Sequence, residues 1–267
     1  MPKTVLALAP HPDDAEYYAG GTLAKFAREG TRVIVVAVTD GRCGSFAVDS
    51  AMLPDLREAE ACRGATVLGA EPPIFLGYAD YTLDTLPPGQ LREQFVRLIR
   101  QFRPDVVVVE DAAALGDAHP DHRAVAWAAS DALTSAALPR VYPQHLAEGL
   151  QPHFVVEKYF YAEEGLGANM AVDVSETLVQ KLAALAEHKT QMEFLVDDVM
   201  RQAQAAGLDV AAMPAVPAGD PAALVAWAMK RQAAAIGKRF GMAYAEAFRY
   251  VRFHPFIETL LTAGPGE

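Results

Sequence analysis

Two short segments of the chain carry residue types that could build an open metal site with an acid and a base beside it. They hold His11, Asp13 and Asp14 near the start, and His119, Asp121 and His122 near the middle. Neutral imidazole and carboxylate are common zinc ligands, and a catalytic zinc site keeps a fourth position open for water. Zinc lowers the pKa of such water to about 7, so a carboxylate that does not bind the metal could act as the base. The two segments therefore predict metal-assisted hydrolysis.

Each segment also has a simpler interpretation. Asp13 or Asp14 could cap the helix that follows, because Asp is a preferred N-cap and negative charge is favourable there. Capping explains one acid, but neither His11 nor a second acid. The later segment could be a solvated surface loop, but a run of site-type residues after a buried strand favours a site. A dinucleotide site needs a Gly-x-Gly-x-x-Gly turn, and adjacent carboxylates would repel a phosphate.

The elements that must position these residues alternate between strand and helix. Apolar, strand-like runs cover residues 4–9, 32–39, 74–76 and 105–110, and helical patterns cover residues 16–28, 54–64, 91–102 and 121–138. This alternation indicates α/β: a Rossmann-like, doubly wound, mainly parallel sheet with helices on both faces. Ligands bind at the carboxyl ends of such strands. The two segments follow two of these ends, so they can converge although about a hundred residues separate them.

The later part of the chain has a different texture. Residues 153–162 and 170–174 predict two more strands, and residues 176–206 and 221–238 predict two long Ala-rich helices. Between these helices, residues 207–219 are rich in Pro and Ala and predict a mobile loop. We expect one domain over residues 1–267, with residues 176–240 as a helical C-terminal elaboration.

The composition of the chain indicates which kinds of binding partner and which cellular compartment to expect. The 267 residues carry a formal net charge of −11 and show no basic patch, which argues against nucleic acid. Two cysteines without a CxxC motif favour a reducing compartment. Without a signal-like leader or an apolar run of about 18 residues, we expect a cytoplasmic protein with no membrane partner. The apolar C-terminal helices could join copies, so a homo-oligomer is compatible with the sequence.

Further motifs accompany the two segments. They are Gly-Gly-Thr-Leu at residues 20–23, Val-Thr-Asp-Gly at residues 38–41, Arg-Glu at residues 57–58 and Leu-Gly at residues 68–69. With Pro-His-Pro-Asp-Asp at residues 10–14 and His-Pro-Asp-His-Arg at residues 119–123, the chain resembles the PIG-L/LmbE-like zinc-dependent deacetylases. These enzymes remove acetyl groups from N-acetylglucosamine units in glycosyl-phosphatidylinositol, mycothiol and bacillithiol precursors. The resemblance covers roughly residues 4–142, and more weakly residues 159–191.

The resemblance implies a role for each site residue. The ligands of Zn²⁺, or alternatively Fe²⁺, would be His11, Asp14 and His122. Asp13 would be the general base, and His119 would steady the oxyanion and protonate the leaving amine, oriented by Asp121. Arg57 and Arg140 would contact the substrate, although Arg57 could instead be an ordinary charge on a helix surface.

The chain departs from the family pattern at Ala15 and over residues 197–238, and neither departure affects the proposed metal ligands. Many members carry Glu directly after the Asp pair, where this chain has Ala15 followed by Glu16. Residues 188–191 (His-Lys-Thr-Gln) resemble a His-Lys-Ser-Gln stretch of some members, in which we expect His188 to be structural. Residues 197–238 match nothing in the family, which leaves the sugar and its aglycone open.

The expected reaction is hydrolysis of the N-acetyl amide of an N-acetylglucosamine-type sugar conjugate, a small molecule. Two alternatives remain at this point. The same machinery could cleave another amide or an ester. The chain could also be a non-catalytic zinc- or sugar-binding protein, which would be indifferent to loss of Asp13.

Overall fold

The computed structural model describes residues 3–113, 119–162, 165–208, 220–252 and 255–262. In this part of the chain the strands are β1 (Thr4–Ala9), β2 (Arg32–Thr39), β3 (Ile74–Tyr78), β4 (Val106–Glu110), β5 (Glu157–Tyr161), β6 (Met170–Asp173) and β7 (Ala245–Val251). The helices are α1 (Asp14–Arg28), α2 (Leu53–Leu68), η1 (Leu83–Thr85), α3 (Gln90–Phe102), α4 (Pro120–Ser135), α5 (Gln144–Ala147), α6 (Leu178–Glu187), α7 (Lys189–Ala205), α8 (Pro221–Phe240) and α9 (Pro255–Thr262).

The strands form one sheet in the order β3-β2-β1-β4-β5-β7-β6. β1 pairs in parallel with β2 and with β4, and β3 and β5 continue the parallel array on either side. Among the described strands, only β7 runs the other way, antiparallel to its neighbours β5 and β6. The predicted Rossmann-like, mainly parallel α/β fold is confirmed. The strand order reverses between β1 and β4, which is where open α/β sheets bind their ligands.

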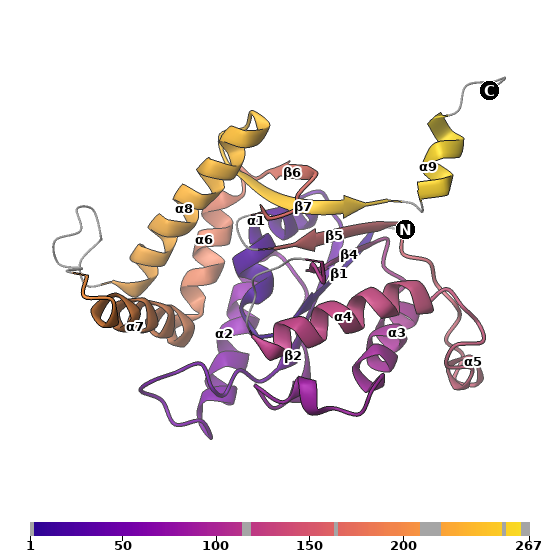
Figure 1. The fold of residues 1–267 in the computed structure, drawn as a ribbon, viewed down its shortest axis with the longest axis horizontal. Helices are drawn as coiled ribbons and strands as arrows, with labels where there is room; N and C mark the ends of the chain where they lie inside the picture. The colour runs from indigo at the N-terminus through magenta and orange to yellow at the C-terminus, as the bar shows by residue number, and fades with distance from the viewer. Residues whose placement is uncertain (1–2, 114–118, 163–164, 209–219, 253–254, 263–267) are drawn as a thin grey trace.

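Both faces of the sheet are buried, as the continuous apolar strands require. Along β1, Leu6 and Leu8 pack on the face covered by α3 and α4. Val5 and Ala7 alternate with them and pack on the other face, against α1 and α6. Figure 1 shows α3 and α4 side by side, with α6, α7 and α8 grouped on the opposite side of the molecule. This packing holds the carboxyl ends of β1 to β4 at one edge.

The C-terminal region differs from the sequence prediction in two places. The helix expected over residues 176–206 is two helices, α6 and α7, which meet at buried His188. β7 was not predicted, and it returns the chain to the sheet between β5 and β6. Most of the predicted loop 207–219 lies outside the described residues. Among the helices that the structure describes, none is long and apolar enough to cross a membrane.

Candidate functional site

Loops that follow four neighbouring parallel strands converge at the carboxyl edge of the sheet. The loop after β1 brings His11, Asp13 and Asp14, and the start of α4 brings His119, Asp121 and His122. The loops after β2 and β3 add Cys43, Asp80 and Tyr81. The predicted convergence of the two segments is therefore confirmed.

Three of these residues form a compact triangle of possible metal ligands. Nδ1 of His11 lies 3.1 Å from Nε2 of His122 and 3.1 Å from Oδ2 of Asp14. The third side, from Nε2 of His122 to Oδ2 of Asp14, measures 3.4 Å. Ligands placed tetrahedrally at ordinary zinc distances lie about 3.3 Å apart. The donor atoms and their spacing therefore fit one face of a zinc tetrahedron, with all three side chains buried.

A carboxylate lies behind each of the two histidines. Nε2 of His11 is 3.0 Å from Oδ1 of Asp80, and Nδ1 of His122 is 2.8 Å from Oε2 of Glu110. Such carboxylates hold the ring orientation and tautomer of a metal-binding histidine and raise its basicity. Each ring therefore directs one nitrogen into the triangle and the other to an acid.

Charge interactions dominate the electrostatics of this cluster. Burial by itself lowers the pKa of His11, but Asp14 and Asp80 outweigh it and raise that pKa to about 9. Burial favours the neutral form of Asp14, yet His122 and His11 hold its pKa well below the usual range. In the same way, His11 overcomes burial and lowers the pKa of Asp80 to about 2. Because metal ligands must be deprotonated, binding would release the proton of His11.

Asp13 and Arg57 form a buried ion pair beside the triangle. Nη2 of Arg57 bonds Oδ1 of Asp13, and Nη1 donates to the carbonyl oxygen of Gly41 at 2.9 Å. Both side chains are buried, with Arg57 only 2% exposed. The alternative that Arg57 is an ordinary surface charge is therefore wrong. Its guanidinium instead fixes the orientation of the Asp13 carboxylate within the cavity.

His119 is the N-cap of α4. Its Nδ1 accepts a hydrogen bond from the backbone amide of Asp121 at 3.2 Å, which places the proton of the neutral ring on Nε2. The pKa of His119 is lowered to about 4, mainly by burial and next by the charges of the nearby His11 and His122. The neutral ring can therefore donate a hydrogen bond from Nε2 near neutral pH.

Asp121 acts on this region through two different groups. Its backbone amide holds His119, as described above. Its fully buried carboxylate accepts hydrogen bonds from the amides of Tyr81 at 2.6 Å and Leu83 at 3.0 Å. Tyr81 has a φ of +63°, a conformation that costs energy for a residue other than glycine, and its ring lies 4.2 Å from that of His119. The carboxylate thus stabilises the turn that carries Tyr81.

The structure does not place Arg140 among the residues that line the site, so its expected substrate contact stays a prediction. Arg140 is exposed and lies beyond the C-terminal end of α4, whereas the site lies at the N-terminal end. The 16 residues of α4 span about 24 Å. Sequence reasoning also missed two acids, Asp80 and Glu110. Glu110 ends an otherwise apolar strand, and Asp80 follows β3 by two residues, so their place at strand ends was an available signal.

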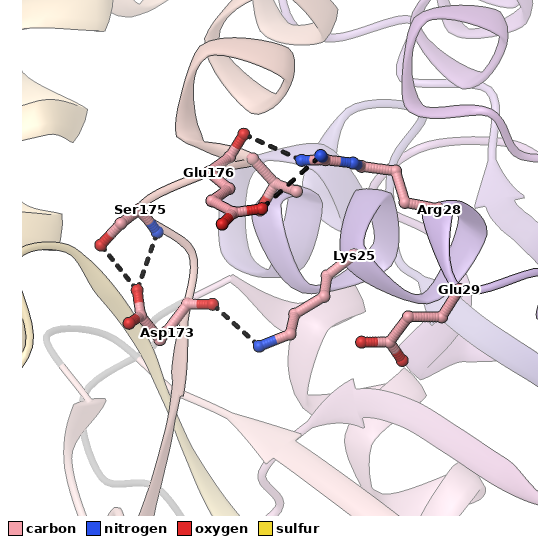
Figure 2. Close-up of a pocket in the computed structure, with 7 residues that line it drawn as sticks. Lys25, Arg28, Glu29, Asp173, Ser175 and Glu176 are labelled. Carbon is pink, nitrogen blue, oxygen red and sulfur yellow. Dashed lines mark hydrogen bonds and ion pairs between the residues drawn. The ribbon is translucent and has the colours of Figure 1, made fainter.

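A cavity of about 200 Å³ opens onto the cluster. It is lined by His11, Asp13, Asp14, Cys43, Gly44, Arg57, Asp80, Tyr81, His119, His122, Gln191 and Phe194. A larger cavity of about 480 Å³ lies elsewhere, between the C-terminal end of α1 and the segment before α6. Its two basic groups are engaged locally: Lys25 donates to the carbonyl oxygen of Asp173, and Arg28 donates to that of Glu176 (Figure 2). No histidine or cysteine lines it, so the metal-type chemistry belongs to the smaller cavity.

Comparisons with known proteins identify the family of this chain. The model of the family described as "PIG-L: GlcNAc-PI de-N-acetylase" matches residues 6–133. Diacetylchitobiose deacetylase of Thermococcus kodakarensis is 32% identical over 191 residues, which cover 71% of this chain and 70% of the relative. A probable N-acetyl-alpha-D-glucosaminyl L-malate deacetylase 2 of Bacillus anthracis is 29% identical over 207 residues, which cover 74% of this chain and 85% of that protein.

A solved structure is similar over nearly the whole chain. The N,N'-diacetylchitobiose deacetylase of Pyrococcus horikoshii, complexed with an inhibitor, aligns with a TM-score of 0.76 and 26% identity. The alignment covers 96% of this chain and 88% of that one. Sequence and fold therefore agree, and the resemblance noted in the sequence is confirmed. The chain belongs to the PIG-L family of deacetylases.

Proposed function

We propose that this chain is a zinc-dependent hydrolase that removes the acetyl group from an N-acetylglucosamine-type amide of a small sugar conjugate. One observation carries the proposal: the triangle of His11, Asp14 and His122 lies beside Asp13 in an open cavity. Zinc held by these three residues would polarise the acetyl carbonyl and make water acidic enough to lose a proton near neutral pH. The named deacetylases among the relatives support the substrate class.

Asp13 is the general base of the proposed reaction. Its Oδ1 is engaged by Arg57, which leaves Oδ2 to take the proton of the attacking water. Because the guanidinium of Arg57 is also held by the carbonyl of Gly41, the carboxylate is oriented before substrate arrives. A base positioned in this way requires no reorganisation during the attack.

His119 stabilises the charge that develops on the acetyl oxygen. Its Nε2–H is the donor, because Nδ1 is occupied as the acceptor of the helix cap. A neutral imidazole is a poor source of a whole proton. We therefore assign the proton of the leaving nitrogen to Asp13, which has just received one, in place of the transfer from His119 that the sequence suggested.

The test is amine release from N-acetylglucosamine conjugates by metal-stripped protein, with and without added zinc. The conjugates include diacetylchitobiose and the malate and inositol glycosides, and parallel reactions receive ferrous iron. We expect zinc-restored release that Asp13→Asn abolishes while the variant keeps its bound zinc. No release from any conjugate by zinc-loaded protein would refute the proposed function.

A further inference from the structure

Part of the cavity wall comes from α7, in the C-terminal region. Gln191 and Phe194 both line the cavity. They lie three residues apart, so they project from the same face of the helix. Both lie outside residues 6–133, which the family model matches, and Gln191 ends the His-Lys-Thr-Gln stretch at residues 188–191. The mechanism proposed above leaves both without a role.

Gln191 carries a polar atom that the protein does not satisfy. Its Oε1 is buried, and no group among the described residues donates a hydrogen bond to it. Buried carbonyl oxygens are rarely left in this state, because the lost hydration is costly. Because the Gln191 side chain lines the cavity, a ligand bound there could supply the missing donor.

Gly44 packs closely against both Gln191 and Arg57. A Cβ atom at Gly44 would lie 3.1 Å from Oε1 of Gln191 and 2.7 Å from Nη1 of Arg57. Only glycine therefore lets the amide and the guanidinium keep these positions. Because Arg57 bonds Asp13, Gln191 lies near the proposed base.

The first turn of α7 is held rigidly against α2. Thr190 donates two hydrogen bonds to Glu60, from its amide at 3.1 Å and from its hydroxyl at 2.6 Å. Glu60 lies one turn after Arg57 on α2, and His188 at the start of α7 is fully buried. These contacts preorganise Gln191 relative to Arg57. The helix break at His188 thus directs α7 toward the cavity.

We propose that Gln191 is a substrate-binding residue whose Oε1 accepts a hydrogen bond from a hydroxyl of the bound sugar. Phe194 adds an apolar wall one turn later, and its ring lies 5.1 Å from that of Phe46. A pyranose presents hydroxyl groups at its edge and C–H groups on its faces, so an amide beside an aromatic ring matches it. The inference rests on the proposed function and deepens it by naming a residue that selects the sugar.

The test removes the amide of Gln191 and, separately, single hydroxyl groups of the substrate, and asks whether the two losses in kcat/KM depend on each other. Gln191→Met keeps the length of the side chain but removes the acceptor. Zinc-loaded wild type and variant are assayed with an N-acetylglucosamine conjugate and with its 3-, 4- and 6-deoxy analogues. We expect the variant to lose about tenfold in kcat/KM with the full substrate, mainly through KM, which corresponds to one hydrogen bond. With wild type, the analogue that lacks the contacted hydroxyl should show a similar loss in kcat/KM. With that same analogue, Gln191→Met should cause no further loss in kcat/KM.

The matched control is Gln204→Met, an exposed glutamine on the same helix, which should behave as wild type with every substrate. If Gln191→Met lowers kcat/KM equally for the full substrate and all analogues, the contact does not exist and the inference is overturned. An unchanged kcat/KM in Gln191→Met overturns it as well. Wild type that is inactive with every conjugate refutes the proposed function, and this inference with it.

Discussion

Replacing Glu110 with Gln tests whether a residue outside the ligand triangle sets the metal affinity. Glu110 is buried at the end of β4, with Oε2 2.8 Å from Nδ1 of His122. Glutamine has nearly the same size and can place a neutral oxygen beside that nitrogen. The substitution therefore removes the negative charge while the ring keeps its place.

The magnitude follows from the distances. Through the imidazole ring, the Glu110 carboxylate would lie about 7 Å from a metal on Nε2. At an effective dielectric constant of about 20, its attraction for a divalent ion is then about 5 kcal/mol. This attraction is an upper bound, because neighbouring groups and solvent relax when the charge is removed. Loss of a carboxylate behind a metal-binding histidine typically lowers metal affinity by about 10- to 100-fold, so we expect a loss of roughly 50-fold in zinc affinity for Glu110→Gln.

Competition with a chromophoric chelator measures this affinity directly. Glu193→Gln, an exposed acid on α7, is the matched control and should bind zinc as wild type does. Circular dichroism and urea denaturation establish that both variants are folded. Wild-type affinity in a folded Glu110→Gln variant would refute the argument that this carboxylate acts through His122.

Three further predictions follow from the site and its support. Asp13→Asn should lower kcat by about 10²- to 10⁴-fold and leave the zinc content at one ion per chain. Turnover assays measure the first quantity and metal analysis the second. Retained turnover would reject Asp13 as the base. Zinc affinity should rise about tenfold per pH unit and level off near pH 9, because the raised pKa of His11 keeps a proton on its ring below that pH. Chelator competition from pH 6.5 to 9.5 measures this dependence. An affinity that does not change with pH would contradict the prediction. Gly64→Ala should lower the free energy of unfolding in urea by about 1–3 kcal/mol, because the new Cβ would lie 2.8 Å from Nε2 of buried His188. In a helix with free space the same change would stabilise by about 1 kcal/mol, so a gain in stability would show that the contact relaxes.

The first half of the fold was predictable because its signals are local. Continuous apolar strands alternate with helices, and the metal-type residues directly follow two of those strands. The parallel topology then brings the strand ends together, so the convergence of the two segments could be predicted. The choice of His11, Asp14 and His122 within them came from the family resemblance. Asp80 and Glu110 could not be assigned roles, because a single acid after a strand has many possible partners and only the folded structure names one.

The second half depends on tertiary contacts that leave no local pattern. Residues 176–206 contain no glycine or proline that would end a helix, and the break at His188 coincides with its burial and with the Thr190–Glu60 contacts. β7 was missed because its buried Glu246 interrupts an apolar run. That carboxylate accepts hydrogen bonds from the amides of Gly21 and Thr22 in α1. Arg140 rested on the resemblance alone, because no local pattern links it to the two segments.

The ligand triangle also has a mechanical consequence. His11 and His122 are 111 residues apart in the chain, and they belong to the loop after β1 and to α4. An ion held between them would act as a cross-link that closes a loop of that length. By the chain-entropy relation for cross-links, such a closure is equivalent to about 4.7 kcal/mol in the unfolded ensemble. The metal would then join two layers of the molecule as well as serve the reaction, so the unfolding temperature would follow the free zinc concentration.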